Sequence, residues 1–280
     1  MKAVRSWAAA CAISLAALGV AHAQAVPAEK TDAASTFTPH SGQPGKDVVW
    51  VPSPQALVDR MMEMAGAGPS DYLVDLGSGD GRTVITAAKR GIRAMGVEYN
   101  PDMVALSRRN AEAAGVGDKA RFVQGDIFET NFSDATVLTL FLLPDLNVRL
   151  RPTILEMKPG TRVVSNTFTM GDWTPDQSID AGGDCTSYCR AHRWIVPAKV
   201  GGTWKLPDGE LKLTQKYQTV TGTLTSGGKE VAISDGKLNG SEIAFSAGDA
   251  RYTGQVNGTR IDAKTAAGKT QSWTGTLGGS

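Results

Sequence analysis

The chain has 280 residues, of which 41% are hydrophobic and 20% are charged, and its formal net charge is +1. These values are typical of a soluble globular protein with one large domain or two ordinary ones. The balanced charge, with no basic face in the sequence, argues against a nucleic-acid substrate held mainly through its phosphates.

Residues 1–23 are predicted to be a secretory signal peptide, which is absent from the mature protein. Lys2 and Arg5 give it a basic start, an apolar stretch follows over 8–21, and 21–23 read Ala-His-Ala, a small-residue cleavage site. The apolar stretch is shorter than the roughly 20 residues of a spanning helix, although a retained anchor is the alternative. We therefore expect a periplasmic or secreted protein that does not span the membrane after cleavage.

Residues 24–47 are rich in Ala, Thr, Pro, Ser and Gly, and we predict a flexible leader there. Ordered structure is predicted to begin near residue 48, and Ser53 could cap a helix that has Pro54 at its first position. Apolar residues then follow at helical spacing, namely Leu57, Val58, Met61, Met62 and Ala65.

A regular alternation of strands and helices occupies residues 48–196, the predicted catalytic domain. We predict strands at 72–75, 94–98, 120–124, 136–140 and 162–167, and helices at 82–90, 101–114 and 146–157. Asn100 is the expected cap of the second of these helices, with Pro101 in its first turn and Gly115 at its end. This alternation is typical of a doubly wound, mostly parallel, Rossmann-like α/β sheet.

Residues 75–82 read Asp-Leu-Gly-Ser-Gly-Asp-Gly-Arg between a predicted strand and a helix, an arrangement that holds adenosine-containing cofactors. A dinucleotide fingerprint would place its third glycine at position 82, which is Arg82 here. The G-x-G-x-G form after Asp75 favours S-adenosylmethionine (SAM) over NAD, which argues against a nicotinamide oxidoreductase.

Acidic residues follow three successive predicted strands. Asp75 could accept hydrogen bonds from the ammonium group of SAM, Glu98 from both ribose hydroxyls, and Asp126 from the adenine amino group. The alternatives are a solvent-facing acid at Glu98 and an ordinary Gly-Asp turn at Asp126. The full set of predicted cofactor-binding residues is Asp75, Gly77, Ser78, Gly79, Gly81, Glu98, Tyr99, Asp126 and Ile127.

The loop after the fourth strand, residues 141–147, is expected to face the transferable methyl group, or else to be an ordinary strand-to-helix connection. Trp50, Pro144 and Asn147 are the candidates for the substrate-facing surface. Methyl transfer from a sulfonium needs an aligned nucleophile and exclusion of water more than it needs a strong base. We therefore predict no particular catalytic base and no metal.

Residues 48–175 resemble class I SAM-dependent methyltransferases, and more narrowly the ATP-synthase-c-subunit lysine methyltransferase family and its bacterial relatives. The matching segments are Val51-Pro52-Ser53-Pro54, Asp75 through Arg82, Glu98-Tyr99-Asn100-Pro101, Phe141 with Pro144, Arg162-Val163-Val164-Ser165, and Trp173-Thr174-Pro175. The resemblance implies SAM as methyl donor and a protein lysine or similar small amine as acceptor, with no nucleic acid. The alternative is an exported SAM-binding or ligand-binding module without turnover, whose C-terminal part contacts envelope components.

Residues 197–280 contain short alternating runs broken by turn residues, including Asn239-Gly240 and Asn257-Gly258, which are strong hairpin signals. We predict an antiparallel β domain of about seven or eight strands that forms a meander or barrel. Trp204 and Trp273 would lie in its first and last strands, as core residues rather than ligand-stacking ones.

Cys185 and Cys189 are the cysteines that remain after signal cleavage. In an oxidising compartment they could form a local disulfide clip. Free thiols are the second possibility, and a metal site that includes the nearby His192 is the third.

Overall fold

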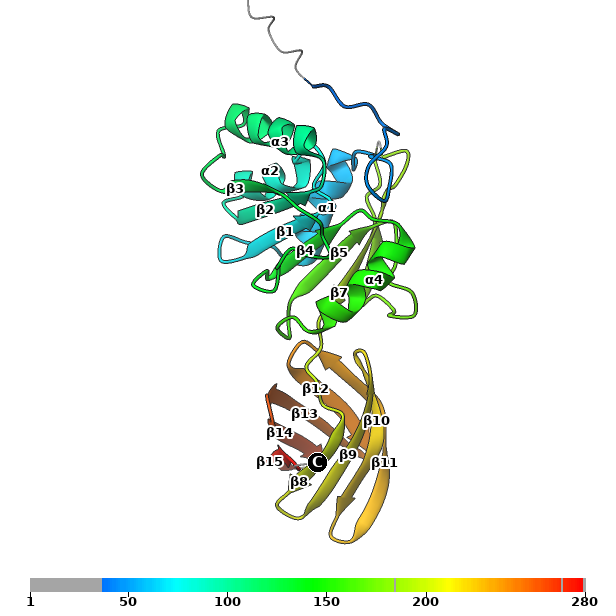
Figure 1. Ribbon diagram of the computed structural model, residues 1–280. Helices are drawn as coiled ribbons and strands as arrows, with labels where there is room; N and C mark the ends of the chain where they lie inside the picture. Colours follow the sequence, from blue (N-terminus) through cyan, green and yellow to red (C-terminus); the bar gives the residue numbers. More distant parts are fainter. Residues whose placement is uncertain (1–36, 184, 268, 279–280) are drawn as a thin grey trace, which may run out of the picture. The chain divides into compact units, whose positions relative to one another are not determined.

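The computed structural model describes residues 37–183, 185–267 and 269–278 (Figure 1). The predicted signal peptide, and the predicted leader as far as residue 36, lie outside the described residues. The described chain contains one α/β sheet followed by a closed β-barrel, which confirms the predicted fold class.

The α/β part carries four helices within the described residues, α1 (Gln55–Ala65), α2 (Arg82–Lys89), α3 (Pro101–Ala113) and α4 (Pro144–Leu155). Its strands are β1 (Tyr72–Leu76), β2 (Arg93–Glu98), β3 (Ala120–Gln124), β4 (Val137–Leu140), β5 (Arg162–Asn166), β6 (Gln177–Asp180) and β7 (Arg190–Ile195). The five strands predicted from the sequence are all present, within two residues at each end.

The sheet order is β3-β2-β1-β4-β5-β7-β6, with β1 paired in parallel to both β2 and β4. The order of the strands therefore reverses between β1 and β4. At such a switch point, the connections after the two strands run to opposite faces and leave a crevice at the carboxyl ends. Asp75 lies near this end of β1, opposite Gly96 of β2 and Thr139 of β4.

Strands β6 and β7, at one side of the sheet, were not predicted. β7 pairs antiparallel with β5 and β6 pairs antiparallel with β7, so the sheet is mixed at this edge. β6 is short and mostly exposed, which leaves little apolar alternation for sequence reasoning to detect.

Helices cover both faces of the sheet. Apolar side chains of α1, α2 and α3 share one buried cluster with the sheet, whereas those of α4 share a second cluster with other strand residues. The predicted apolar face of α1 is confirmed, because Leu57, Val58, Met61, Met62 and Ala65 are buried.

The two predicted helix caps have different outcomes. Asn100 caps α3, and its side-chain oxygen accepts a hydrogen bond of 2.9 Å from the backbone N–H of Asp102. The predicted Ser53 cap is wrong: Pro54 is the N-cap of α1, and no side chain caps that helix. The Ser53 hydroxyl instead accepts a 3.0 Å hydrogen bond from the Asn166 amide, at the end of β5.

The C-terminal barrel contains eight strands, β8 (Gly202–Leu206), β9 (Gly209–Lys216), β10 (Thr219–Ser226), β11 (Lys229–Asn239), β12 (Glu242–Ala247), β13 (Ala250–Asn257), β14 (Arg260–Ala267) and β15 (Lys269–Leu277). Pairing of β15 with β8 closes it, so no strand edge remains open. Trp204 is fully buried and Trp273 packs against the same core, which confirms both as core residues.

The turn between β9 and β10 contacts the α/β part. The Gln218 side chain accepts a 2.8 Å hydrogen bond from the Trp173 indole and donates one of 2.8 Å to the Thr174 carbonyl. The Tyr217 ring stacks on the Trp173 ring with centroids 5.7 Å apart. The domain boundary at residues 196 and 197 stays a prediction.

Candidate functional site

A cleft lies at the carboxyl ends of β1 to β4 and has a volume of about 1030 Å³, including its open mouth. The residues that line it include most of the predicted cofactor-binding set, namely Asp75, Gly77, Ser78, Gly79, Glu98, Tyr99, Asp126 and Ile127.

The glycine loop needs its glycines for close packing. A Cβ atom at Gly81 would lie 2.7 Å from the Phe122 ring, and one at Gly79 would lie 2.4 Å from the Trp50 indole nitrogen. Both glycines also have positive φ angles, of 84° and 53°. Gly81 does not line the cleft; it brings α2 close to the sheet and so sets the position of the loop.

Arg82, which replaces the third glycine of a dinucleotide fingerprint, begins α2. Its guanidinium donates a 2.8 Å hydrogen bond to the Ser53 carbonyl and forms an ion pair of 2.6 Å with Asp80. Arg82 thereby joins the glycine loop to the segment that precedes α1.

Asp75 is a buried carboxyl group at the base of the cleft. Only 6% of the residue is exposed, and Oδ1 accepts a 2.6 Å hydrogen bond from the Thr139 hydroxyl. Burial raises the pKa of Asp75 to about 7, against the opposing effect of the Thr139 hydrogen bond. A cationic ligand placed beside this group would stabilise its ionised form.

Glu98 organises the turn at the end of β2. Its carboxylate accepts a 2.9 Å hydrogen bond from the Gly79 N–H and another of 2.9 Å from the Asn100 N–H. Each carboxylate oxygen keeps a further lone pair, so Glu98 can still accept hydrogen bonds from ligand hydroxyls.

Asp126 lies after β3, where Oδ1 accepts a 2.9 Å hydrogen bond from the Phe128 N–H and Oδ2 pairs with the ammonium of Lys46. The hydrogen bond from Lys46 is the main reason that the pKa of Asp126 is below its ordinary value. The Lys46 ammonium also lies 4.8 Å from the centre of the Tyr99 ring. One cation therefore bridges two residues of the predicted cofactor-binding set.

Residues 42–50, which include the end of the predicted flexible leader, form a small hairpin at the cleft. The Gly42 N–H donates to the Trp50 carbonyl over 2.8 Å, and the Trp50 N–H donates to the Gln43 carbonyl over 2.9 Å. Residues 43–50 all line the cleft. Sequence reasoning missed this hairpin and Lys46, because the segment has neither apolar periodicity nor a motif.

The structure places the three substrate-facing candidates differently. Trp50 lines the cleft. Pro144 is exposed at the first turn of α4 and is not among the lining residues. Asn147 is completely buried and points its amide nitrogen at the Phe168 and Thr169 carbonyls, 3.4 and 3.3 Å away. The prediction that Asn147 faces the substrate is therefore wrong, since this side chain lies on the inner face of α4.

The side chains of the cleft suit the polar groups of SAM. The ligand presents an ammonium group, two ribose hydroxyls and an amino group, all of which donate hydrogen bonds. The carboxyl groups of Asp75, Glu98 and Asp126 are hydrogen-bond acceptors that line the cleft at the ends of the neighbouring strands β1, β2 and β3. The buried Ser78 hydroxyl has no hydrogen-bond partner within the protein and packs against Gly96 of β2.

Across residues 37–183, 185–267 and 269–278, there is no group of three or more His, Cys, Asp or Glu side chains placed to hold a metal ion. No helix in the described part of the chain is long and apolar enough to span a membrane.

Comparisons with known proteins agree with the chemistry of the cleft. A family model described as the ANTKMT methyltransferase domain matches residues 75–177. Protein-lysine N-methyltransferase of Saccharolobus islandicus (strain REY15A) is 42% identical over 147 residues, which cover 51% of this chain and 87% of that protein. The ATP synthase c-subunit lysine N-methyltransferase of Mus musculus is 38% identical over 138 residues, 48% of this chain and 55% of that protein, so the chain spans about half the length of this relative.

A solved structure is also similar. The crystal structure of an RNA methyltransferase from Salinibacter ruber in complex with S-adenosyl-L-homocysteine matches with a TM-score of 0.50 and 47% identity, over 54% of this chain and 96% of that one. Its ligand is SAM without the transferred methyl group. These relatives are named as methyltransferases, which does not support a binding module without turnover. The chain is therefore an enzyme that uses SAM as methyl donor, and it belongs to the family of SAM-dependent methyltransferases that carry the ANTKMT methyltransferase domain.

Proposed function

We propose that this enzyme N-methylates a lysine side chain of a protein, or a similar amine. The observation that carries the proposal is the match to the protein-lysine N-methyltransferase of Saccharolobus islandicus, which is 42% identical and is covered over 87% of its length. The mouse relative, at 38% identity, is also named as a lysine N-methyltransferase.

The cofactor-binding roles follow from the order of the carboxylates. Asp75 lies deepest, between β2 and β4, and takes the ammonium end of SAM. Glu98 at the end of β2 accepts from the ribose hydroxyls, and Asp126 after β3 accepts from the adenine amino group. In this order the methyl group points toward the end of β4.

The wall at the end of β4 is apolar and suits an alkyl amine. Leu140, Phe141 and Leu142 line the cleft there, with Trp50 and Leu146 also in the lining. A lysine ammonium must lose its proton before its nitrogen can attack the methyl group, and low-polarity surroundings favour the neutral amine by lowering its pKa. SAM supplies the electrophilic methyl group, so the protein has to align the amine and exclude water.

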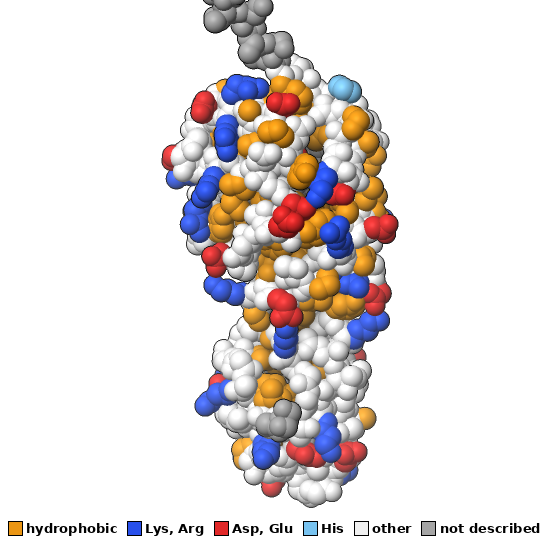
Figure 2. All heavy atoms as spheres, viewed as in Figure 1, with side chains coloured by type: hydrophobic (Ala, Val, Ile, Leu, Met, Phe, Trp, Pro, Cys, Tyr) orange, Lys and Arg blue, Asp and Glu red, His pale blue; other side chains and the backbone are white. Residues whose placement is uncertain are grey.

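A methyl-transfer assay tests this proposal. Purified protein would be incubated with SAM that carries a labelled methyl group and with three separate acceptors: poly-L-lysine, a membrane-protein extract, and total RNA. RNA is included because the Salinibacter ruber relative is titled an RNA methyltransferase. The visible face of the protein carries interspersed acidic and basic side chains rather than a basic stripe (Figure 2), which favours protein over RNA as acceptor.

We expect labelled Nε-methyl-lysine after hydrolysis of one of the protein acceptors and no label in RNA. The Asp75→Ala variant should transfer much less label at the same SAM concentration, and it controls for contaminating enzymes. Label in RNA alone, or none in either protein acceptor, would contradict the proposal.

We further infer that the protein works in the periplasm or outside the cell. The signal-like pattern over residues 1–23 and the disulfide between Cys185 and Cys189 support this, because disulfides persist in oxidising compartments. Sequencing the N-terminus of protein from a periplasmic fraction tests it. A mature chain that starts near residue 24 is the expected result, and an uncleaved chain confined to the cytoplasm would overturn it.

A further inference from the structure

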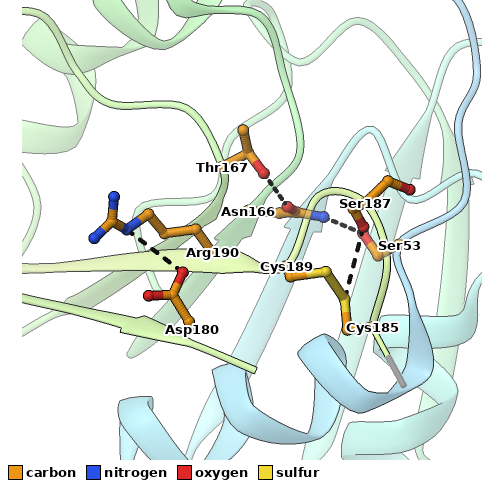
Figure 3. The surroundings of a disulfide bond; sticks show 8 residues. All are labelled: Ser53, Asn166, Thr167, Asp180, Cys185, Ser187, Cys189 and Arg190. Atoms are coloured by element: carbon orange, nitrogen blue, oxygen red, sulfur yellow. Dashed lines mark hydrogen bonds and ion pairs between the residues drawn. A yellow bond between two sulfur atoms is a disulfide. The ribbon is translucent and has the colours of Figure 1, made fainter. Parts of the chain in front are cut away.

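The loop between β6 and β7 is closed by the disulfide between Cys185 and Cys189, whose Cα atoms lie 5.7 Å apart (Figure 3). The Ala181 N–H also donates a 2.7 Å hydrogen bond to the Cys189 carbonyl at the base of the loop. Figure 3 shows the disulfide near Asn166, whose amide bonds the Ser53 hydroxyl just before α1. The loop that the Cys185–Cys189 disulfide closes therefore lies beside the end of β5 and the residues just before α1.

Tyr188 lies inside this loop in a strained backbone conformation, with a φ angle of 53°. A non-glycine residue in the left-handed region costs free energy and persists where the surrounding structure holds it there. Its neighbour in sequence, Cys189, is one of the two cross-linked residues. The disulfide therefore fixes the short segment that holds Tyr188 in this conformation.

The Tyr188 ring packs edge-on against Phe141, with ring centroids 5.2 Å apart. Phe141 follows β4 directly and lines the cleft at the end where the methyl group is expected. Phe141 also stacks with Phe168, at 6.2 Å between centroids. Three aromatic rings thus stand side by side at the acceptor end of the cleft.

Phe168 is held independently of the disulfide. Its carbonyl oxygen lies 3.4 Å from the amide nitrogen of the buried Asn147. The adjacent Thr167 donates its N–H to the Arg190 carbonyl over 2.7 Å, and its own carbonyl lies 3.1 Å from His192 Nε2. Phe141 therefore has a fixed neighbour on one side and, on the other, a neighbour whose position depends on the disulfide.

Exposure in this region also indicates a binding role. In the described part of the chain the exposed large hydrophobic residues are Val49, Tyr99, Leu143, Val148 and Tyr188, and Tyr188 is 41% exposed. Val49 and Tyr99 line the cleft, and Leu143 is two residues from Phe141. Apolar surface left exposed around a cleft is typical of a binding site.

From this arrangement we propose that Tyr188 is a positioning residue for the acceptor amine: held by the Cys185–Cys189 disulfide, it fixes the Phe141 ring against which the alkyl part of the acceptor side chain packs. The inference rests on the proposed function, since an amine on an alkyl stem is the acceptor that such an aromatic wall suits. Opening the disulfide would free the loop, and Phe141 would lose one of its two aromatic neighbours. Cofactor binding would be unaffected, because Asp75, Glu98 and Asp126 lie on other loops.

Steady-state methyl transfer to poly-L-lysine and to the membrane-protein extract tests this, with KM and kcat measured on whichever takes label and the Kd for SAM measured by calorimetry. In Tyr188→Ala we expect KM for the acceptor to rise about fivefold or more, while the Kd for SAM changes less than twofold. Tyr188→Phe should restore the KM because it keeps the ring. Ser187→Ala, a change next to Tyr188 in the same exposed loop, is the matched control and should behave like the wild type.

The role of the disulfide is tested with a variant that carries both Cys185→Ser and Cys189→Ser. Dithiothreitol supplies two electrons and two protons that convert the disulfide to two thiols, and it should raise the acceptor KM of the wild type to that of the double variant. It should have no further effect on the double variant, which has no disulfide between residues 185 and 189 to reduce.

Two results in Tyr188→Ala would overturn the inference while the proposed function stands. One is an unchanged KM for the acceptor, and the other is a SAM affinity that weakens by the same factor as the acceptor KM rises. Failure of the wild type to label either protein acceptor would overturn the proposed function and this inference with it.

Discussion

The cofactor cleft and the C-terminal barrel differ in which side chains they bury and which they expose. In the barrel the strands close on themselves, and Trp204, Leu211 and Phe245 fill the core with almost no exposure. In the cleft, Asp75 is the one buried carboxyl group of the described chain. All five of the exposed large hydrophobic residues in the described chain lie in the α/β part. The barrel is arranged for stability, whereas the cleft keeps features that are unfavourable in the absence of a ligand.

This difference shows which region of the protein can gain free energy by binding a ligand. A buried carboxyl group with a raised pKa lowers its free energy when a cation binds beside it. An exposed aromatic ring lowers its free energy when an alkyl chain covers it. The closed barrel offers neither gain. We therefore expect substitutions in the barrel to change stability, and substitutions in the cleft to change SAM or acceptor binding.

The largest expected effect is on barrel stability. Trp204→Ala removes a fully buried side chain, and we expect a loss of about 3–5 kcal/mol in the free energy of unfolding of the barrel. Thermal unfolding followed by circular dichroism measures the loss. The Kd for SAM of the folded variant should stay within about twofold of the wild type, and a parallel loss of SAM affinity would show that the two regions are not separable in this way.

Loss of a cleft carboxylate should have the next largest effect. Asp75→Ala and Glu98→Ala each remove charge-assisted hydrogen bonds to SAM, and we expect calorimetry to show a Kd at least about 30-fold weaker in both. Asp262→Ala is the matched control, since Asp262 is an exposed barrel carboxylate bonded to Arg260 and Thr274. An unchanged SAM affinity in both cleft variants would contradict the assignment of Asp75 and Glu98 to the SAM site.

The raised pKa of Asp75 gives SAM binding a dependence on pH. The carboxylate form binds the ammonium, so affinity should rise by about tenfold between pH 5.5 and 7, as Asp75 ionises with a pKa of about 7. The neighbouring Asp126 has a lowered pKa and is ionised throughout this range, so it does not contribute. Calorimetric titrations across these pH values give the slope, and a flat profile would contradict the burial of an ionisable Asp75.

The raised pKa of Asp75 has the opposite effect on the stability of the cofactor-free protein, which falls as the pH rises. Because the folded-state pKa of Asp75 lies above its ordinary value of 3.8, the protonated form favours folding, and that stability is lost as the pH rises through 7. Asp75→Asn should therefore unfold at a higher temperature than the wild type at pH 8, by about 4 °C or more, with a smaller difference at pH 5. A difference that grows toward acid pH would show that the sign is wrong.

The smallest expected effect concerns Lys46. It pairs with Asp126, which we propose as the acceptor for the adenine amino group, and it adds positive charge near a cationic cofactor. Lys46→Ala should tighten SAM binding by about two- to fivefold, and less so at high salt. Lys199→Ala, which removes an exposed ion pair with Glu156, is the control and should change nothing. Weaker binding in Lys46→Ala would instead indicate that the lysine covers the bound cofactor.

Much of the fold could be predicted because the signals are local. β3 spans the predicted residues 120–124, and Asn100 and Pro101 mark the start of α3 as predicted. The proximity of the three acidic residues follows from topology alone, since the carboxyl ends of parallel strands meet at one edge of the sheet.

The features that were missed depend on contacts between distant parts of the chain. Ser53 bonds Asn166, 113 residues away, instead of capping α1, and Lys46 pairs with Asp126, 80 residues away. The burial of Asn147 depends on how α4 rotates onto the sheet, which its weak periodicity did not show. Local patterns carry no information on such pairings.

The sequence by itself determined the two kinds of architecture, the cofactor class and the strand ends that carry the carboxylates, because periodicity, turn residues and the glycine loop are properties of neighbouring residues. Tertiary structure alone decided that Asp75 is buried with a raised pKa, that Lys46 reaches Asp126, and that Tyr188 stands against Phe141. Those features arise only when separate segments pack together and exclude water from the groups between them.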